Sequence, residues 1–185
     1  KKFHIPKECS TETLKSSHSL EYINHIKNKT LSIKLQKKIG FPINDSVSRR
    51  SFVATGGTVL ASKLSLDFKL ACNTAGGSHH ATYNFGAGYC VFNDVAVAAN
   101  YLKKKGYAKK ILIIDLDVHQ GNGNSEIFKN DKNVLTFSMH CASNYPAIKS
   151  KGDIDVGLRD NMEDKEYLQI LKKNLIVLNK ENFDA

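Results

Sequence analysis

The stretch Ile111-Leu-Ile-Ile-Asp-Leu-Asp-Val-His-Gln-Gly-Asn-Gly123 joins an apolar run to a group of polar side chains. The branched apolar residues 111–114 predict a central strand of a parallel sheet that is covered on both faces. Side chains alternate across a strand, so Asp115, Asp117 and His119 are expected to point to the same side. Because α/β sheets bind ligands at the carboxyl ends of their strands, the stretch predicts an α/β fold with a functional site at this edge.

Asp117 and His119 are candidate metal ligands. A carboxylate and an imidazole two residues apart can hold a divalent ion and leave positions for a third protein ligand, a water molecule and a substrate oxygen. The alternative is an Asp-rich strand end that only caps the helix after it. This stretch alone is compatible with both interpretations.

A second candidate is Gly76-Gly77-Ser78-His79-His80, where two imidazoles follow a glycine turn. Adjacent side chains diverge on a helix or a strand, whereas an irregular loop can aim both inward. Beside a metal-bound water, His79 and His80 would act as general acid and general base. The alternative is a His-His loop on the surface. The following loop, residues 84–90, is rich in glycine and aromatic residues, which indicates the lip of a narrow channel.

The rest of the sequence predicts alternating helices and strands. Apolar stripes at helical spacing predict helices at residues 18–29, 47–63, 94–105, 125–129 and 164–178. Asn44 or Asp45 is the candidate cap of the second, and Asn93 or Asp94 of the third. Short apolar runs predict strands at residues 68–73, 111–115 and 134–138. Residues 68–115 would then form a β-α-β unit, and residues 181–185 are typical of the approach to a further strand.

The composition favours one globular domain over residues 1–185, with 41% hydrophobic content. No apolar run has the length of a membrane-spanning helix and the N-terminus lacks a secretory signal, so we expect a cytoplasmic protein. The four cysteines are widely spaced without a Cys-x-x-Cys pair, which favours reduced thiols over a zinc knuckle or a disulfide framework. The net charge of +9 is compatible with an anionic partner, but the lysines are scattered, so direct nucleic-acid binding is disfavoured.

Together, the motifs at residues 76–80, 86–90 and 115–123 resemble those of the zinc-dependent histone deacetylase family in order and spacing. The Gln-Gly-Asn-Gly version of the last motif is most similar to class IV members and their bacterial relatives. The resemblance runs from about residue 18 to the end. It implies an arginase/deacetylase fold, in which a mainly parallel sheet lies in a three-layer α/β/α arrangement with zinc at the carboxyl ends of strands. The chain would then be the N-terminal and central part of a longer catalytic domain.

The resemblance implies specific roles for the candidate residues. The zinc ligands would be Asp117 and His119. His80 would be the general base, and His79 would assist near the leaving amine. Asp115 would orient His79.

Further positions follow from the same resemblance. Asn122 stands where many relatives carry a carboxylate behind a histidine, which would make His80 a weaker base. A structural K⁺ ion would bind near the backbone of Ser138 and Met139. The walls of the channel that holds the substrate would be Gly88, Tyr89 and Tyr145.

The implied activity is zinc-dependent hydrolysis of acetyl-type amides on lysine side chains, in a protein or peptide, or on related small amines. The family's third zinc ligand and its oxyanion-stabilising tyrosine would lie beyond Ala185. The nearby carboxylates Asp153 and Asp155 are not expected to replace that ligand, because their setting is typical of a turn. Two alternatives stay open, which are a catalytically inactive binding or structural protein and a polyamine-directed or arginase-like hydrolase. The sequence does not indicate an oligomeric state.

Overall fold

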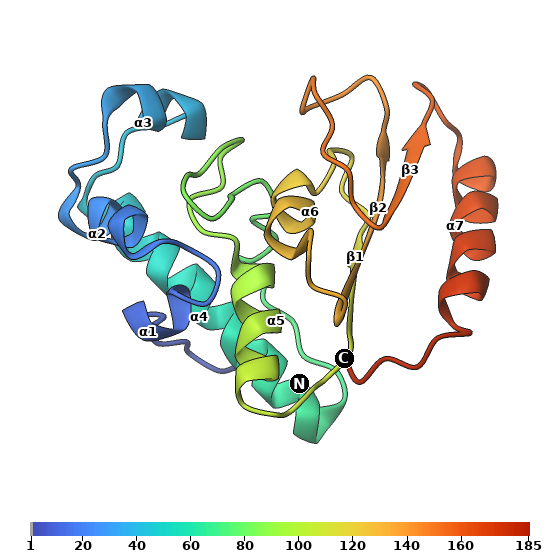
Figure 1. Cartoon of the computed structure of the whole chain (residues 1–185), viewed down its shortest axis with the longest axis horizontal. Helices are drawn as coiled ribbons and strands as arrows, with labels where there is room; N and C mark the ends of the chain where they lie inside the picture. The colour runs from blue at the N-terminus through green and yellow to red at the C-terminus, as the bar shows by residue number, and fades with distance from the viewer. Residues whose placement is uncertain (1) are drawn as a thin grey trace. The chain divides into compact units, whose positions relative to one another are not determined.

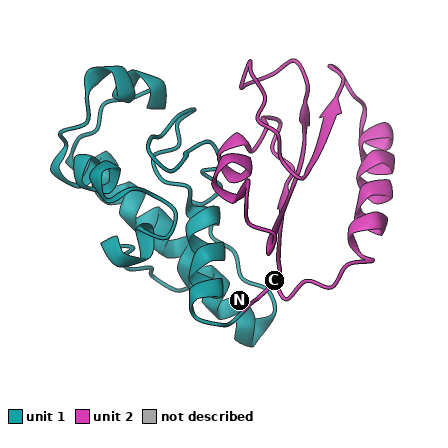
Figure 2. Ribbon diagram, viewed as in Figure 1, with its two compact units in different colours: residues 1–107 teal, residues 108–185 magenta. Residues whose placement is uncertain are grey.

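The computed structural model describes residues 2–185, which form two compact units, unit 1 up to residue 107 and unit 2 from residue 108 to residue 185 (Figure 2). Each unit is described by itself. None of the helices in residues 2–185 combines the length and the apolar composition that a membrane span requires. Cys9 and Cys90 are buried, whereas Cys72 is exposed.

Unit 1 is helical and comprises α1 (Thr11–Leu14), α2 (Leu20–Asn28), α3 (Ile33–Ile39), α4 (Asp45–Phe68) and α5 (Asp94–Lys104) (Figure 1). Within residues 2–107, each of these helices begins after a Ser or Asn whose side chain accepts a hydrogen bond from the backbone N–H three residues further on. Such caps satisfy backbone donors that a helix leaves unpaired at its start. The core of the unit includes Leu14, Ile23, Ile26, Ile39 and Phe92.

Unit 2 contains a parallel sheet in the order β1-β2-β3, formed by β1 (Ile111–Asp115), β2 (Val134–Cys141) and β3 (Ile154–Leu158). The helices α6 (Asn122–Phe128) and α7 (Asp164–Leu178) lie on opposite sides of this sheet (Figure 1). Phe137 and Met139 of β2 belong to the apolar core with Leu178 of α7, and Leu135 packs against it. The even-numbered Thr136, Ser138 and His140 are buried and polar, so the two faces of β2 differ in chemistry.

Most predicted elements are confirmed. The helices at 18–29, 47–63, 94–105, 125–129 and 164–178 correspond to α2, α4, α5, α6 and α7, and Asn44 and Asn93 are the caps. The strands at 111–115 and 134–138 are β1 and β2. The central position expected for the first is wrong for the described sheet, because β1 lies at one end of the order β1-β2-β3 and Ile114 is 43% exposed. The approach to a further strand is also visible, because the backbone N–H of Asp184 donates to Lys110 O and that of Leu112 donates to Ala185 O, both at 2.8 Å.

The strand predicted at residues 68–73 is wrong, and with it the β-α-β unit that would begin there. Helix α4 continues to Phe68, and Lys69 ends it in the left-handed conformation with φ +61°. Leu70 is 85% exposed, and residues 70–73 belong to no strand. A short apolar run becomes a strand only where a neighbouring strand pairs with it. Three further elements, α1, α3 and β3, were not predicted.

Candidate active site

His79 and His80 lie buried in a loop of unit 1, with 6% and 3% of their surface exposed. Their ring centroids are 4.1 Å apart, and the rings are tilted by 45°. The backbone N–H of His79 donates to Gly77 O at 3.0 Å, which bends the chain just before the pair. The surface loop considered above as an alternative is therefore wrong, since both imidazoles are enclosed by protein.

The loop before the two histidines is held by the buried carboxylate of Asp94, the first residue of α5. Ser78 N donates to Asp94 Oδ1 at 2.7 Å, and Gly77 N donates to Asp94 Oδ2 at 3.1 Å. The Thr58 hydroxyl of α4 donates to the same Oδ2. A Cβ atom on Gly76 would lie 2.6 Å from Oδ2, so this close approach requires glycine. Asp94 thus fixes the backbone from which His79 and His80 project.

Asn73 extends this network by one step. Its Nδ2 donates to Thr58 Oγ1 at 2.8 Å and to Ala54 O at 2.9 Å. The sequence predicted no functional role for Asn73 or Thr58, and it predicted Asp94 only as an alternative cap of α5. Asn93 alone caps α5, by accepting from Ala96 N at 2.9 Å, so the carboxylate beside it serves the loop.

Tyr89 stands on the neighbouring loop and is 75% exposed. Gly88 and Tyr89 have φ values of +52° and +64°, and Tyr89 N donates to Ile39 O at 2.7 Å. The ring of Phe41 lies 6.2 Å from that of Tyr89. An exposed ring held at its backbone suits the predicted lip of a channel, and the channel itself stays a prediction.

In unit 2, Asp117 and His119 lie just beyond the end of β1. The strand stops at Asp115, so side-chain alternation does not continue through His119, contrary to the sequence-based expectation. Two short turns replace it, because Asp117 N donates to Asp115 Oδ1 at 3.1 Å and His119 N donates to Asp117 Oδ1 at 2.8 Å. Asp and Asn side chains commonly bond the backbone two residues further on in this way.

These turns bring the side chains of the two candidate metal ligands together. His119 Nδ1 lies 2.9 Å from Asp117 Oδ1, and the two side chains are 38% and 51% exposed. Two ligands of a tetrahedral zinc ion, each about 2.0–2.1 Å from the metal, would be roughly 3.4 Å apart, so the pair fits zinc after a small adjustment. Among residues 2–185, no group of three or more His, Cys, Asp or Glu side chains is arranged to hold a metal. The chain therefore supplies a pair of suitable donors.

The Asp115 carboxylate faces the turn into α6. Asn124 Nδ2 donates to its Oδ2 at 3.5 Å, and a Cβ atom on Gly121 would lie 2.2 Å from the same oxygen. Gly121 is therefore required for this close approach. Asn122 begins α6, and its N–H donates to Gln120 O at 2.8 Å.

Gln120 connects the segment that carries Asp117 and His119 to β3. Its Nε2 donates to Asp155 Oδ1 at 2.8 Å and to Ser150 O at 2.7 Å, and its Oε1 accepts from Ser150 N at 2.9 Å. Asp155 therefore lies in β3 rather than in the turn-like setting expected for it. Asp153 accepts from both the N–H and the hydroxyl of Thr136 at 2.8 Å. Both carboxylates are committed to these bonds, which supports their exclusion as ligands.

The remaining predicted site residues of unit 2 are Tyr145 and the β2 residues Ser138 and Met139. The Tyr145 ring lies 6.2 Å from the His119 ring, with an interplanar angle of 78°. The hydroxyl of Ser138 accepts from Gly121 N at 3.3 Å, and Met139 is part of the apolar core. Burial lowers the pKa of His140 on the same strand below its usual value. The K⁺ site near Ser138 and Met139 stays a prediction.

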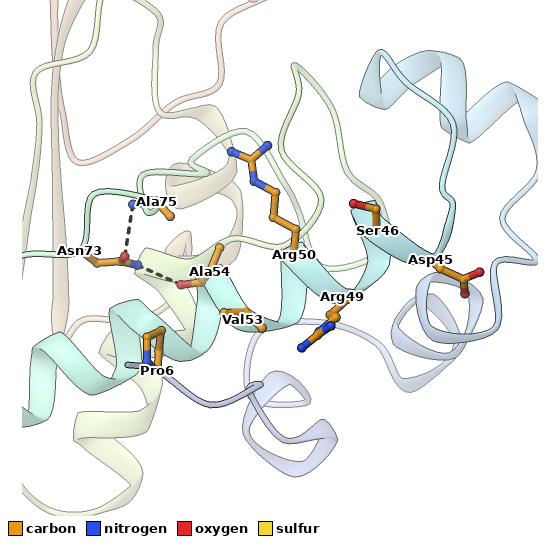
Figure 3. A pocket seen from close by; sticks show the side chains of 9 residues that line it. All are labelled: Pro6, Asp45, Ser46, Arg49, Arg50, Val53, Ala54, Asn73 and Ala75. Atoms are coloured by element: carbon orange, nitrogen blue, oxygen red, sulfur yellow. Dashed lines mark hydrogen bonds between the residues drawn. The ribbon is translucent and has the colours of Figure 1, made fainter. Parts of the chain in front are cut away.

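A separate pocket of about 580 Å³ lies along α4 in unit 1 (Figure 3). Figure 3 shows Arg49 and Arg50 pointing in different directions from the helix, and Asn73 bonded to Ala54. None of the predicted site residues lines this pocket. The nine lining residues are Pro6, Asp45, Ser46, Arg49, Arg50, Val53, Ala54, Asn73 and Ala75.

Comparison with known proteins covers both units. A family profile described as the histone deacetylase domain matches residues 1–183. A crystal structure of an HDAC homolog from Aquifex aeolicus has a TM-score of 0.80 and 29% identity, over 95% of this chain and 53% of that one. A crystal structure of an HDAC homolog complexed with SAHA has a TM-score of 0.81 with the same identity and coverage. These matches agree with the arginase/deacetylase-like α/β fold.

Curated relatives agree with the structural matches. An uncharacterized protein of Picosynechococcus sp. is 46% identical over 158 residues, which are 85% of this chain and 53% of that protein. The acetoin utilization protein AcuC of Staphylococcus aureus (strain COL) is 33% identical over 73% of this chain and 37% of its own length. The chain thus spans about half the length of the first of these relatives, and less of the second.

Proposed function

The chain belongs to the histone deacetylase family, and on that basis we propose that the protein is a zinc-dependent amidohydrolase that removes acetyl-type groups from lysine side chains or related amines. The observation that carries the proposal is the buried pair His79 and His80 on a loop fixed by Asp94. Two imidazoles at fixed positions suit the transfer of protons into and out of an amide. A helix-bundle core needs no such pair.

In this proposal, Asp117 and His119 would hold zinc, which their carboxylate and imidazole groups suit. Zinc supplies Lewis acidity, which polarises an amide carbonyl and lowers the pKa of water. His80 accepts the proton of the attacking water, and His79 delivers a proton to the leaving amine. Tyr89 and Tyr145 guide the acylated side chain, with Gly88 leaving space beside it. The orientation of His79 by Asp115 and the weaker basicity of His80 caused by Asn122 stay predictions.

The test is hydrolysis of an acetyl-lysine peptide by the complete protein loaded with zinc. We expect turnover that a chelator abolishes and added zinc restores. Replacing His80 with alanine should lower kcat by about 10²-fold or more while the zinc content stays intact. Replacing Asp117 with alanine should lower both the activity and the zinc content. His25→Ala on α2 is the control, since His25 is a partly exposed histidine bonded to Thr30, and it should change neither.

Two outcomes of this test would each support a different function. A zinc-loaded protein that binds the peptide without turning it over is a binding or structural member of the family. A protein that hydrolyses acylated polyamines or guanidino compounds but no acyl-lysine peptide is a hydrolase for small amines. Because one solved relative is complexed with SAHA, inhibition by SAHA gives an additional readout for the predicted channel.

A further inference from the structure

Helix α3 carries three exposed lysines, Lys34, Lys37 and Lys38. Within residues 2–185, no Asp or Glu side chain forms an ion pair with any of them. By contrast, Lys29 just before α3 is paired with Asp45 at 2.6 Å. The three lysines therefore form a positive cluster without a counter-charge in the described part of the chain.

Helix stability does not explain the whole cluster. Lysines in the last turn of a helix interact favourably with its dipole, which accounts for Lys37 and Lys38. Lys34 lies in the first turn, where the dipole disfavours a positive charge, and α3 has no acidic residue there. The pKa of Lys38 is lowered from its usual value, first by desolvation and then by the charge of Lys34. The like charges therefore repel one another within α3.

The cluster is attached to the loop that carries Tyr89. The carbonyl oxygens of Lys38 and Ile39 accept hydrogen bonds from Gly88 N at 3.3 Å and Tyr89 N at 2.7 Å. The Nζ atom of Lys38 lies 3.4 Å from the centroid of the Phe85 ring. A cation over an aromatic face is attracted by the ring, which holds the Lys38 ammonium beside this loop.

We propose that Lys34, Lys37 and Lys38 select acylated-lysine substrates whose flanking residues are acidic. The inference rests on the proposed function, in which Tyr89 lies at the lip of the channel that receives the acyl-lysine. An unpaired positive cluster fixed beside this lip attracts carboxylates on either side of the acylated residue and raises their rate of encounter. A peptide with lysine or arginine at the same positions is repelled.

The experiment compares three acetyl-lysine peptides with the zinc-loaded complete protein. They are identical except for the residues flanking the acetyl-lysine, which are Asp and Glu, Asn and Gln, or Lys and Arg. Both kcat/KM and the affinity measured by fluorescence anisotropy are determined at low and at high salt. We expect the acidic peptide to be preferred over the neutral one by about three- to tenfold at low salt, because exposed charge pairs are weak and are screened by ions.

The variant replaces Lys34, Lys37 and Lys38 with glutamine. We expect it to lose the preference, so that its affinities for the acidic and the neutral peptide become equal. The matched control replaces Lys165, Lys172 and Lys173 of α7 with glutamine, which changes the net charge equally and should keep the preference. Thermal unfolding of both variants verifies that they fold.

Different results would contradict the proposed hydrolase activity and the proposed role of α3. Equal affinity of the parent for the acidic and neutral peptides, or a preference that the α3 variant retains, would overturn the inference about α3. If the protein binds the acidic peptide more tightly and the α3 variant loses this preference, but no peptide is hydrolysed, the proposal about α3 stands and the proposed hydrolase activity is wrong.

Discussion

The segment with His79 and His80 and the segment with Asp117 and His119 are held in opposite ways. The two histidines of the first are at most 6% exposed, and their loop is anchored by the buried Asp94 of another element. The second segment is about half exposed and bends through short turns made by its own Asp side chains. Proton-transfer groups work best at fixed positions, whereas ligands that receive a metal gain their final geometry from it. The structure thus contains one segment fixed by a buried carboxylate of another element and one segment shaped by its own exposed side chains.

The largest effect should come from Asp94→Ala. The change leaves the N–H groups of Gly77 and Ser78 and the Thr58 hydroxyl without their shared acceptor, which we expect to cost about 3 kcal/mol or more of unfolding free energy. Displacement of His79 and His80 should lower kcat/KM by about 10²-fold. Chemical denaturation and peptide hydrolysis measure both effects.

The control for this prediction is Asp45→Ala, because Asp45 is likewise the first residue of its helix. Its side chain is 90% exposed and paired only with Lys29, so we expect a loss below about 1 kcal/mol. Equal losses for the two variants would show that Asp94 acts only as a helix-start carboxylate. Where Asp94→Ala does not fold, Asp94→Asn keeps one acceptor oxygen and allows the same measurements.

The next largest effect should be a loss of the stability of unit 1 at acidic pH. His18 is fully buried, with Nδ1 donating to Thr82 O at 2.9 Å and Nε2 accepting from Asn93 N at 2.9 Å, so the ring is neutral. Burial lowers its pKa to about 4, from 6.5 in the unfolded chain. The unfolded state then binds more protons between these values, so stability is fully present above pH 6.5 and falls as the pH drops toward 4. The loss is on the order of 3 kcal/mol.

Unfolding free energies between pH 7.5 and 4 measure this loss. His18→Gln removes the titrating group and should flatten the pH dependence, although it also lowers the stability at neutral pH. A variant whose stability falls as steeply in acid as that of the parent would assign the loss to other groups. Because Asn93 precedes Asp94, His18 also supports the start of the helix that anchors the histidine loop.

These residues show what the sequence could and could not reveal. Periodicity and caps predicted the long helices, β1 and β2, because those signals are local. The strand at 68–73 and the strand β3 depended on pairing partners, which no local pattern encodes. The spacing of Asp117 and His119 predicted that their side chains lie together, and they do, although two short turns replace the expected alternation. The roles of Asp94 and Gln120 required the fold, since their partners are 16 to 36 residues away.

A smaller effect should distinguish alanine substitutions at Gly40 and Gly106, which both have positive φ. Gly40 ends α3 with φ +111°, and a Cβ atom there would lie 2.7 Å from the Tyr89 ring. Gly106 has φ +71° with open space around it. Alanine at either position should cost about 1 kcal/mol of stability through backbone strain. Only Gly40→Ala should also displace the Tyr89 ring, which we expect to raise KM for an acetyl-lysine peptide without lowering kcat. An unchanged KM would place this ring outside the path of the substrate.

The smallest effect concerns the aromatic contact of the metal-ligand segment. Tyr145 meets His119 edge to face at 6.2 Å, and such pairs contribute about 0.5–1.5 kcal/mol. Tyr145 is 40% exposed, so we expect Tyr145→Leu to weaken zinc binding by only about three- to tenfold. Competition with a metal-sensitive dye measures the affinity. Tyr145→Phe keeps the ring and should bind zinc as the parent does, and Tyr107→Leu, which removes a similarly exposed tyrosine, should also leave the affinity unchanged. If Tyr145→Leu binds zinc as tightly as the parent, the turns at Asp115 and Asp117 alone orient the ligands, and the contrast with the multiply anchored histidine loop becomes sharper.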